Sequence, residues 1–254
     1  MSARLAGKKA IVTGASRGIG EAIAAAFVKE GARVAICARK EEGLAEAAGR
    51  IAAGQKDAVF YRPCHVGRME EINPFVEWAL EKLGGLDILV NNAATNPHFG
   101  PALEADWPVF DKTFEVNLKS AFEFCRRVVE FWKKNSRGGS IVNIASIAGL
   151  RAAPMQGIYG MTKAALISLT QTLAVELGPL GIRVNAIAPG VVETRLSAVL
   201  VHTPEILKVF TDHTALKRHG RPEEIAPLAV FLASEESSLV TGQTFCADAG
   251  FTVA

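Results

Sequence analysis

The sequence predicts one doubly wound α/β domain over residues 1–254, in which a seven-stranded parallel sheet is flanked by helices. Short runs rich in β-branched residues alternate with stretches of helical periodicity from one end of the chain to the other. Strands that alternate with helices favour right-handed crossovers, and therefore a parallel sheet covered on both faces. The chain has no internal repeat, no low-complexity tract and no long linker, so we expect a single domain.

The strands are expected where a short apolar run is enriched in valine and isoleucine and is bounded by glycine or polar residues. Such runs have apolar residues at consecutive positions because both faces of a parallel sheet are covered. In chain order they are Lys9–Thr13, Arg33–Cys37, Ala58–Arg62, Asp87–Val90, Ser140–Ala145, Arg183–Ile187 and Gln243–Ala247.

Between these strands, apolar residues recur at spacings of three and four, which is typical of helices that bury one face. Glycines such as Gly31 and Gly181 stand where helices should end. No helix or strand is assigned to Leu196–Thr214, whose apolar residues follow no clear strand pattern. The expected helices are Gly18–Glu30, Glu42–Ala53, Met69–Leu83, Trp107–Asn135, Gln156–Leu177 and Pro222–Ser234.

The composition is that of an ordinary globular protein, with 49% hydrophobic residues, 21% charged residues and a net charge of +2. A net charge this small gives no electrostatic case for nucleic acid or a membrane surface as a partner. The four cysteines and the histidines lack metal-ligand spacing, so we expect reduced core thiols and no metal site. No signal peptide or membrane-spanning run is recognised, and a cytoplasmic location is the expectation.

A glycine-rich turn follows the first strand and opens the first helix, in the sequence Thr13-Gly14-Ala15-Ser16-Arg17-Gly18-Ile19-Gly20. Glycines let a backbone turn tightly and approach a pyrophosphate closely, and the helix N-terminus then offers free N–H groups to the anion. The strand–turn–helix context is the one that dinucleotide binding requires. We therefore predict contacts to the cofactor from Gly14, Ser16, Arg17, Gly18, Ile19 and Gly20.

The second strand is followed by Arg39 and Lys40. A carboxylate at such a position would accept the ribose 2′-hydroxyl of NAD, whereas a guanidinium pairs with the 2′-phosphate of NADP. Arg17 in the glycine turn supplies a further cation. The sequence therefore favours NADP(H), with NAD(H) as a possible alternative.

Tyr159 and Lys163 are four residues apart in a predicted helix and so share one face. An unperturbed tyrosine has a pKa of about 10, too high for ready proton exchange near neutrality. A close ammonium would stabilise the phenolate, so we expect Lys163 to lower the pKa of Tyr159. The pair is thus a candidate for general acid–base chemistry.

Together these features resemble the classical short-chain dehydrogenase/reductases over essentially the whole chain. The resemblance rests on the glycine turn, on Asn91-Asn92-Ala93-Ala94, on Asn117, on Ser146 thirteen residues before Tyr159, on Lys163, and on Pro189-Gly190 with Thr194. It implies a doubly wound Rossmann-type fold and hydride transfer between a nicotinamide cofactor and a carbonyl or secondary alcohol. The segments around His65 and Asn96 are similar to those of NADPH-dependent carbonyl and retinal reductases.

The resemblance also implies roles for individual residues. Tyr159 would be the general acid and base, Ser146 would polarise the substrate oxygen, Lys163 would also hold the nicotinamide ribose, and Asn117 would anchor a water linked to Lys163. Residues about 191–216 would form a flap over the substrate, and Thr95, Asn96, Pro97, Met155 and Gln156 would shape the pocket with it. The remaining cofactor contacts would come from Val66, Asn92, Ala93, Ala94, Pro189, Gly190, Val192 and Thr194.

Two departures from the family pattern stand out. His65 replaces the aspartate that usually contacts the adenine amino group, which puts that contact in doubt. The last strand leads into Ala247-Asp248-Ala249-Gly250 in place of a Val-Asp-Gly-Gly-like end, a change expected to affect packing more than chemistry.

Three further expectations follow from the family. The first alternative function is 3-oxoacyl-acyl-carrier-protein reduction, for which Arg137 could help to dock an acidic carrier. The second is a non-catalytic nucleotide-sensing scaffold, although all four polar active-site positions are filled. The helices at Trp107–Asn135 and Gln156–Leu177 commonly pair between subunits in this family, so we expect a homotetramer by analogy.

Overall fold

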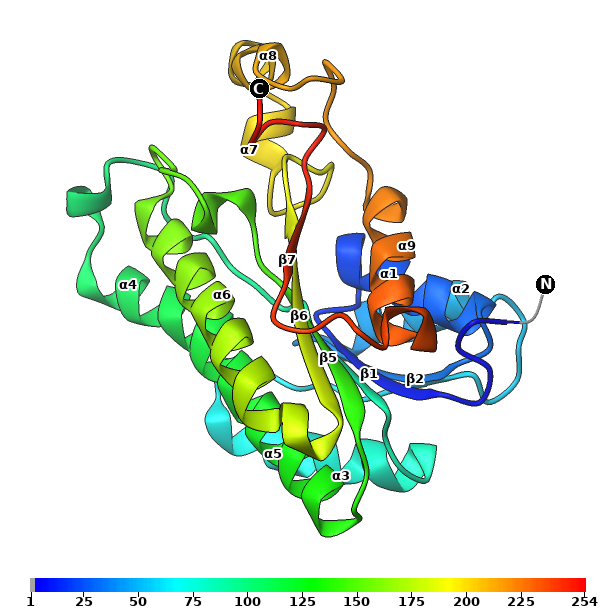
Figure 1. Ribbon diagram of the computed structural model, residues 1–254. Coiled ribbons are helices and arrows are strands. Elements are labelled where there is room, and N and C mark those ends of the chain that lie inside the picture. Colours follow the sequence, from blue (N-terminus) through cyan, green and yellow to red (C-terminus); the bar gives the residue numbers. More distant parts are fainter. Residues whose placement is uncertain (1–2) are drawn as a thin grey trace.

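The computed structural model describes residues 3–254, which contain one sheet of seven parallel strands (Figure 1). The strand order is β3-β2-β1-β4-β5-β6-β7. This arrangement confirms the predicted fold class. The strands are β1 (Lys9–Thr13), β2 (Arg33–Cys37), β3 (Val59–Tyr61), β4 (Ile88–Asn91), β5 (Gly139–Ile144), β6 (Ile182–Pro189) and β7 (Thr244–Ala247).

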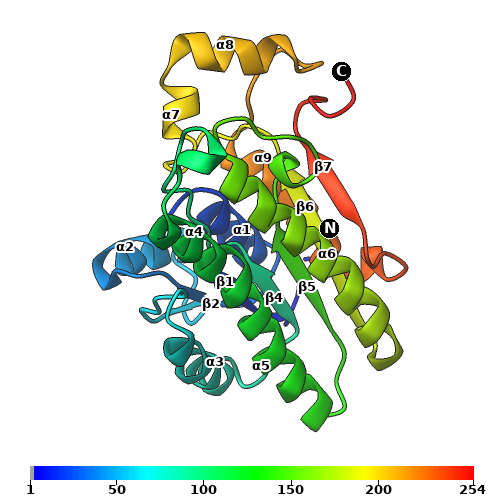
Figure 2. The same ribbon diagram turned by 90° about the vertical axis from the view of Figure 1, so that its left-hand side faces the viewer.

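Helices cover both faces of the sheet, and short helical turns complete several connections (Figures 1 and 2). The helices are α1 (Gly18–Lys29), α2 (Glu41–Ala52), α3 (Met69–Leu83), α4 (Trp107–Phe114), α5 (Ser120–Lys134), α6 (Gly157–Leu177), α7 (Ala198–Val201), α8 (Pro204–Asp212) and α9 (Pro222–Ala233). The short turns are η1 (Ala102–Glu104), η2 (Glu115–Lys119), η3 (Ile147–Gly149), η4 (Gly178–Leu180) and η5 (Glu235–Ser237).

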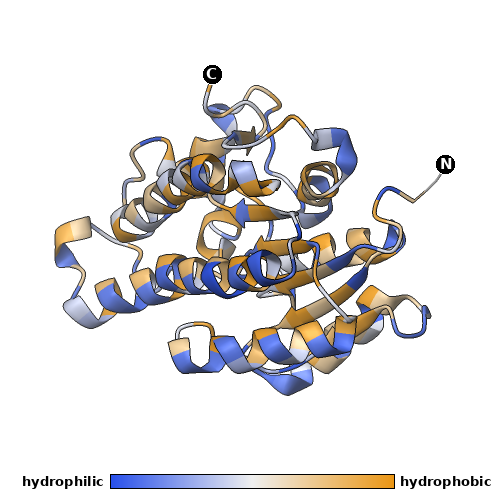
Figure 3. Cartoon of the chain, turned by 60° about the horizontal axis from the view of Figure 1, so that its bottom comes forward, coloured by the Kyte–Doolittle hydropathy of each residue, from blue (hydrophilic) through white to orange (hydrophobic). Residues whose placement is uncertain are grey.

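The strands β1 to β6 contribute to two hydrophobic cores because successive side chains point to opposite faces. In β1, Ala10 and Val12 pack with α1, α2 and α9, whereas Ile11 packs with α3, α5 and α6. The same alternation in β2 sends Val34 and Ile36 to the first core. Figure 3 shows the result, with hydrophobic residues concentrated in the sheet and on the helix faces turned toward it. The sheet is thus buried on both sides, as its apolar runs predict.

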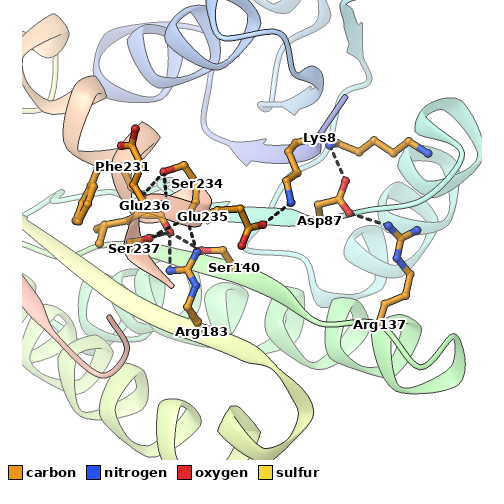
Figure 4. Close-up of polar contacts among 12 residues, drawn as sticks. Lys8, Asp87, Arg137, Ser140, Arg183, Phe231, Ser234, Glu235, Glu236 and Ser237 are labelled. Atoms are coloured by element: carbon orange, nitrogen blue, oxygen red, sulfur yellow. Dashed lines mark hydrogen bonds and ion pairs between the residues drawn. The ribbon is translucent and has the colours of Figure 1, made fainter. Parts of the chain in front are cut away.

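Polar contacts tie the amino ends of the strands together, at the edge of the sheet opposite their carboxyl ends (Figure 4). The Asp87 carboxylate accepts from the backbone N–H of Lys9 at 2.9 Å and from the Arg137 guanidinium at 2.8 Å. The ammonium of Lys8 donates to the Glu235 carboxylate at 2.8 Å. Arg137 is therefore committed to a structural ion pair at this edge.

Two predictions of local structure need correction. The helical pattern over 107–135 is one continuous prediction, but the chain forms α4, a π-helical turn over Glu115–Lys119, and α5. The segment 196–214, to which no helix is assigned, contains α7 and α8. A π turn keeps helical dihedral angles and therefore leaves no mark in the hydrophobic spacing.

Helices α7 and α8 lie beyond the carboxyl end of β6, next to the C-terminal segment (Figures 1 and 2). The rings of Phe210 and Phe251 stack with their centroids 5.6 Å apart. The backbone N–H of Leu216 donates to the carbonyl of Ala249 at 3.1 Å. The C-terminal segment therefore supports this part of the chain. Across residues 3–254, no helix combines the length and the apolar character needed to cross a membrane.

Candidate active site

Hydrogen bonds around Thr13 lock the end of β1 to the end of β4. The Thr13 hydroxyl accepts from the backbone N–H groups of Asn92 at 3.0 Å and Ala93 at 3.1 Å, and donates to the carbonyl of Val90 at 3.3 Å. The Asn92 side-chain amide donates to the carbonyls of Thr13 at 2.9 Å and Gly14 at 3.1 Å. The strand order reverses between β1 and β4, which is where open α/β sheets bind ligands.

The glycine turn packs too closely against its surroundings for side chains. Gly14 and Gly18 have φ angles of +66° and +61°, which other residues adopt only with strain. A Cβ atom on Gly14 would lie 2.8 Å from the Cα of Ala93, and one on Gly20 would lie 2.7 Å from the carbonyl oxygen of Gly14. A Cβ on Gly18 would lie 3.3 Å from the methyl group of Thr194. The absence of side chains thus lets the turn pack directly against the loops after β4 and β6, a tight turn of the kind that fits a cofactor's pyrophosphate.

Helix α1 begins directly after this turn, and the side chain of its N-cap residue Arg17 does not cap it. The first backbone N–H groups of the helix, with the neighbouring Ser16 and Ile19, could therefore bind an anion. Arg17, Arg39 and Lys40 are all exposed, and none of the three forms an ion pair within residues 3–254. These cations could receive a 2′-phosphate without breaking an existing salt bridge.

The loop after β6 reaches the same end of the sheet. Pro189 is the last residue of β6, and a Cβ atom on Gly190 would lie 2.8 Å from the Cα of Asp248. Val192 is buried, and Thr194 lies against the glycine turn. These four residues are therefore brought beside the glycine turn, where they could bind the nicotinamide end of a dinucleotide.

The segment after β3 also ends at this edge, because the backbone N–H of Cys64 donates to the carbonyl of Ala38 at 2.9 Å. Val66 is buried, with 6% of its surface exposed. The backbone N–H of His65 donates to the Glu71 carboxylate at 2.6 Å. The ring Nδ1 of His65 is buried and has no hydrogen-bond partner among residues 3–254. Because this nitrogen is buried, it is not available to accept a hydrogen bond from the adenine amino group, as the usual aspartate does.

The predicted catalytic side chains meet at the carboxyl end of β5. Ser146 follows that strand, its hydroxyl accepts from the backbone N–H of Ala148 at 3.1 Å, and it hydrogen-bonds to Tyr159 in the first turn of α6. Lys163 is 2% exposed, and its ammonium donates to the carbonyl of Ile144 at 2.7 Å. It also lies 5.6 Å from the centre of the Tyr159 ring. Ser146, Tyr159 and Lys163 thus form one cluster.

The expected effect of Lys163 on Tyr159 is wrong for this geometry. Burial raises the pKa of Tyr159 to about 12, and the hydrogen bond with Ser146 only partly opposes that rise. Burial also lowers the pKa of Lys163 to about 7. The Lys163 ammonium bonds to the Ile144 carbonyl and lies over the Tyr159 ring, and it forms no hydrogen bond with the Tyr159 hydroxyl. Desolvation therefore determines the pKa of both residues.

Asn117 lies in the π-helical turn and joins three segments. Its Nδ2 donates to the carbonyl of Thr95 at 2.9 Å and to the hydroxyl of Thr162 at 3.0 Å, and its Oδ1 accepts from the backbone N–H of Thr95 at 2.8 Å. Both amide hydrogens are used inside the protein, so Asn117 holds the loop that follows Ala94 against α6. The water that Asn117 is expected to anchor stays a prediction.

Three residues that support the site were missed by sequence reasoning. Thr13 locks β1 to β4, Thr162 receives Asn117, and the Asp248 carboxylate accepts from the backbone N–H groups of Gly250 at 3.0 Å and Thr252 at 2.8 Å. The position of Thr13 directly before the glycine turn is a usable signal. Nothing in the local sequence indicates the other two partners.

Raising the pH from 7 to 10 should stabilise the protein relative to Lys163→Met. The pKa of Lys163 is about 7 in the folded protein and 10.5 ordinarily, so the unfolded chain binds more protons between these values. The free energy of unfolding therefore rises with pH across this window, by roughly 3.5 kcal/mol between pH 7 and pH 10 if the whole shift is realised. Urea unfolding at pH 7, 8.5 and 10 measures this effect.

Lys134→Met serves as the control, because Lys134 is an exposed lysine at the end of α5. It should show the same pH dependence as the wild type. If Lys163→Met also follows the wild type at every pH, Lys163 does not have a lowered pKa.

Known proteins with similar sequences all point to one family. The family described as enoyl-(acyl carrier protein) reductase matches residues 14–252. Dehydrogenase/reductase SDR family member 4 of Homo sapiens is 38% identical over 246 residues, covering 97% of this chain and 88% of that protein. Short-chain dehydrogenase/reductase SDRA of Arabidopsis thaliana is 38% identical over 247 residues, covering 97% and 95%.

Solved structures agree with these sequence relatives. A protein from Sinorhizobium meliloti 1021 described as a short-chain alcohol dehydrogenase superposes with a TM-score of 0.94 at 35% identity, covering 100% of both chains. A protein from Beutenbergia cavernae described as an NAD(P)-dependent gluconate 5-dehydrogenase, with NADP bound at low occupancy, gives 0.93 at 33% identity and 100% coverage of both. The present chain therefore belongs to the short-chain dehydrogenase/reductase family of oxidoreductases.

Proposed function

We propose that this protein is an NADP(H)-dependent oxidoreductase that interconverts a carbonyl compound and a secondary alcohol, with Tyr159 as the general acid and base. The observation that carries the proposal is the cluster of Ser146, Tyr159 and buried Lys163 at the same edge of the sheet as the glycine turn. That edge is where a doubly wound sheet binds its ligands.

The cofactor, when bound, supplies or accepts the hydride. In reduction, the Tyr159 hydroxyl donates its proton to the substrate oxygen while the Ser146 hydroxyl donates a hydrogen bond to the same oxygen. A pKa raised to about 12 keeps Tyr159 protonated at neutral pH, which is the form that reduction needs. Lys163 would bind the nicotinamide ribose, as the family resemblance implies, and the hydrogen bond to the Ile144 carbonyl orients its side chain.

The cofactor preference rests on Arg17, Arg39 and Lys40, which are exposed cations around the end of β2 and the glycine turn. They offer charge to a 2′-phosphate, whereas no carboxylate at residues 38–40 offers an acceptor to a 2′-hydroxyl. The Beutenbergia cavernae relative has NADP bound. NADP(H) is therefore the proposed cofactor, and NAD(H) is expected to bind more weakly.

The proposed substrates are small carbonyl compounds and alcohols, bound beneath a flap over residues 191–216. Solved relatives are described as alcohol and gluconate dehydrogenases, which fits this class. Reduction of an acyl-carrier substrate is the competing function, suggested by the description of the matching family. Arg137 does not support it, because its ion pair with Asp87 lies at the opposite edge of the sheet from Tyr159.

Replacing Tyr159 by phenylalanine should lower kcat for carbonyl reduction about 10²- to 10⁴-fold, because the general acid is removed while the ring is retained. The absorbance of reduced nicotinamide reports the rate on a panel of ketones, diketones and a 3-oxoacyl thioester. Unchanged rates in Tyr159→Phe would refute the mechanism. Turnover confined to the thioester would favour the acyl-carrier alternative, and NADPH binding without any turnover would favour a scaffold.

Replacing Arg39 by aspartate should weaken NADPH binding about 10- to 100-fold and should change NADH binding much less, because only NADPH carries the 2′-phosphate. Nicotinamide fluorescence on titration with protein gives both dissociation constants. Lys56→Asp makes the same charge change at an exposed loop position and should affect neither cofactor. An equal loss of affinity for both cofactors in Arg39→Asp would contradict the assignment.

We also propose that a second copy of the chain covers a groove between α5 and α6. The groove is lined by Leu118, Phe122, Ala165 and Leu169, and Phe122 is 51% exposed there. Family analogy extends this pairing to a homotetramer. Exposed apolar surface of this kind is typical of interfaces between subunits.

In sedimentation at micromolar concentration, the wild type should therefore be larger than a monomer. Phe122→Asp should shift it to smaller species, because a charge would be buried at the contact. The control is Tyr61→Asp, which introduces the same charge at an exposed aromatic residue of β3, an edge strand of the sheet. It should leave the oligomeric state unchanged. A monomeric wild type would contradict the proposal.

A further inference from the structure

Two side-chain amides face each other beside the catalytic cluster. The Nδ2 of Asn96 donates to the Oε1 of Gln156 at 3.0 Å, and both residues are partly exposed. Asn96 belongs to the loop after β4, and Gln156 is the N-cap residue of α6. The bond thus joins segments that are 60 residues apart in the chain. We call Asn96 and Gln156 the amide pair.

Backbone contacts fix the amide pair in place. The N–H of Gly100 donates to the carbonyl of Met155 at 2.9 Å, and Gly100 forms an isolated β-bridge with Gln156. Met155 has a φ angle of +66°, a strained conformation for a residue with a side chain, and it carries the carbonyl that Gly100 needs. Thr95, next to Asn96, is held through both its N–H and its carbonyl by Asn117.

The amide pair lies close to Tyr159. Gln156 is the N-cap residue directly before α6, and its carbonyl accepts from the backbone N–H of Gly160 at 2.9 Å, so Gln156 and Tyr159 both belong to the start of this helix. One turn beyond Tyr159, Thr162 receives the Asn117 amide that holds Thr95. Tyr159 therefore stands between two points at which the 95–96 segment is tied to α6.

The hydrogen bond within the amide pair uses only part of its capacity. Asn96 Oδ1 remains an acceptor, and the two hydrogens on Gln156 Nε2 remain donors, with no protein partner for either group among residues 3–254. A hydroxyl group both donates and accepts, so one hydroxyl can satisfy Asn96 and Gln156 together. An alkyl group in the same position would give no hydrogen bond to Asn96 Oδ1 or to Gln156 Nε2.

We propose that Asn96 and Gln156 determine substrate specificity by binding a hydroxyl group close to the reacting carbonyl, which makes hydroxy ketones the preferred substrate class over plain alkyl ketones. The inference rests on the carbonyl–alcohol chemistry proposed above and names the substrate class for that site. A site built to hydrogen-bond a substrate hydroxyl discriminates strongly against the analogue that lacks it.

The test compares 3-hydroxy-2-butanone with 2-butanone, which differ by one hydroxyl group, as substrates for the full-length protein with NADPH. The readout is the ratio of their kcat/KM values. Gln156→Glu keeps the acceptor for Asn96 and replaces the Nε2 donor offered to substrate by a charged carboxylate oxygen, which cannot donate to the substrate hydroxyl. Asn96→Leu removes the acceptor at similar volume. Each variant should lower the ratio at least about tenfold relative to the wild type, the loss expected for one hydrogen bond.

The inherent reactivity of the two ketones cancels, because every variant is compared with the wild type. Gln171→Met is the matched control, since Gln171 is an exposed glutamine on the same helix, and it should leave the ratio unchanged. The dissociation constant for NADPH and the urea midpoint report folding independently of turnover. If Asn96→Leu does not fold, Gln156→Glu alone decides, because it retains the bond to Asn96.

If the variants lowered kcat/KM equally for both ketones, the amide pair would only shape the loops, and the inference would be overturned. A wild type that reduces 2-butanone as well as its hydroxy analogue would also overturn it, while the proposed function would stand. If the wild type reduced none of the ketones, diketones or the 3-oxoacyl thioester, both this inference and the proposed function would be overturned.

Discussion

The site depends on one constraint, which is that all seven strands are parallel and so end at the same edge of the sheet. The loops after β1, β3, β4, β5 and β6 consequently meet, although their residues are up to about 180 positions apart in the chain. The Thr13–Asn92 hydrogen bonds then turn proximity into fixed geometry at the point where the strand order reverses. Gly14 and Gly20 pack closely against neighbouring backbone at this point, which restricts the conformation of the turn.

Much of this fold could be predicted from the sequence because both faces of the sheet are covered. The strands Lys9–Thr13 and Arg33–Cys37 and the helix Met69–Leu83 are found with the predicted bounds, since apolar runs and helical spacing are direct consequences of burial. The segment 196–214 escaped because its helices are short, with four residues in α7 and nine in α8, although Ile206, Leu207 and Phe210 in α8 follow helical spacing. The π-helical turn at Glu115–Lys119 escaped because its helical periodicity is nearly unbroken.

The members of the candidate site were predictable, but their electrostatics were not. Spacing places Tyr159 and Lys163 on one helix face, and the structure brings them together with Ser146. Spacing does not reveal that the Ile144 carbonyl takes the ammonium, or that burial shifts both pKa values away from the charged forms. Those effects come from the way α6 packs on the end of β5, which the spacing within α6 does not reveal.

Two segments border the proposed substrate site, and one of them is held more firmly than the other. The loop containing Asn96 is fixed by Asn117 on one side and by Met155 and Gln156 on the other. Helix α8, by contrast, has no fully buried residue, and its main aromatic contact is the stack of Phe210 on Phe251. A segment with so few buried contacts opens at low cost. Orientation of a substrate is therefore a task for the loop containing Asn96, where hydrogen-bond geometry is set before binding. In the proposed function, closure over the substrate would fall to α7 and α8, whose apolar contacts tolerate different shapes.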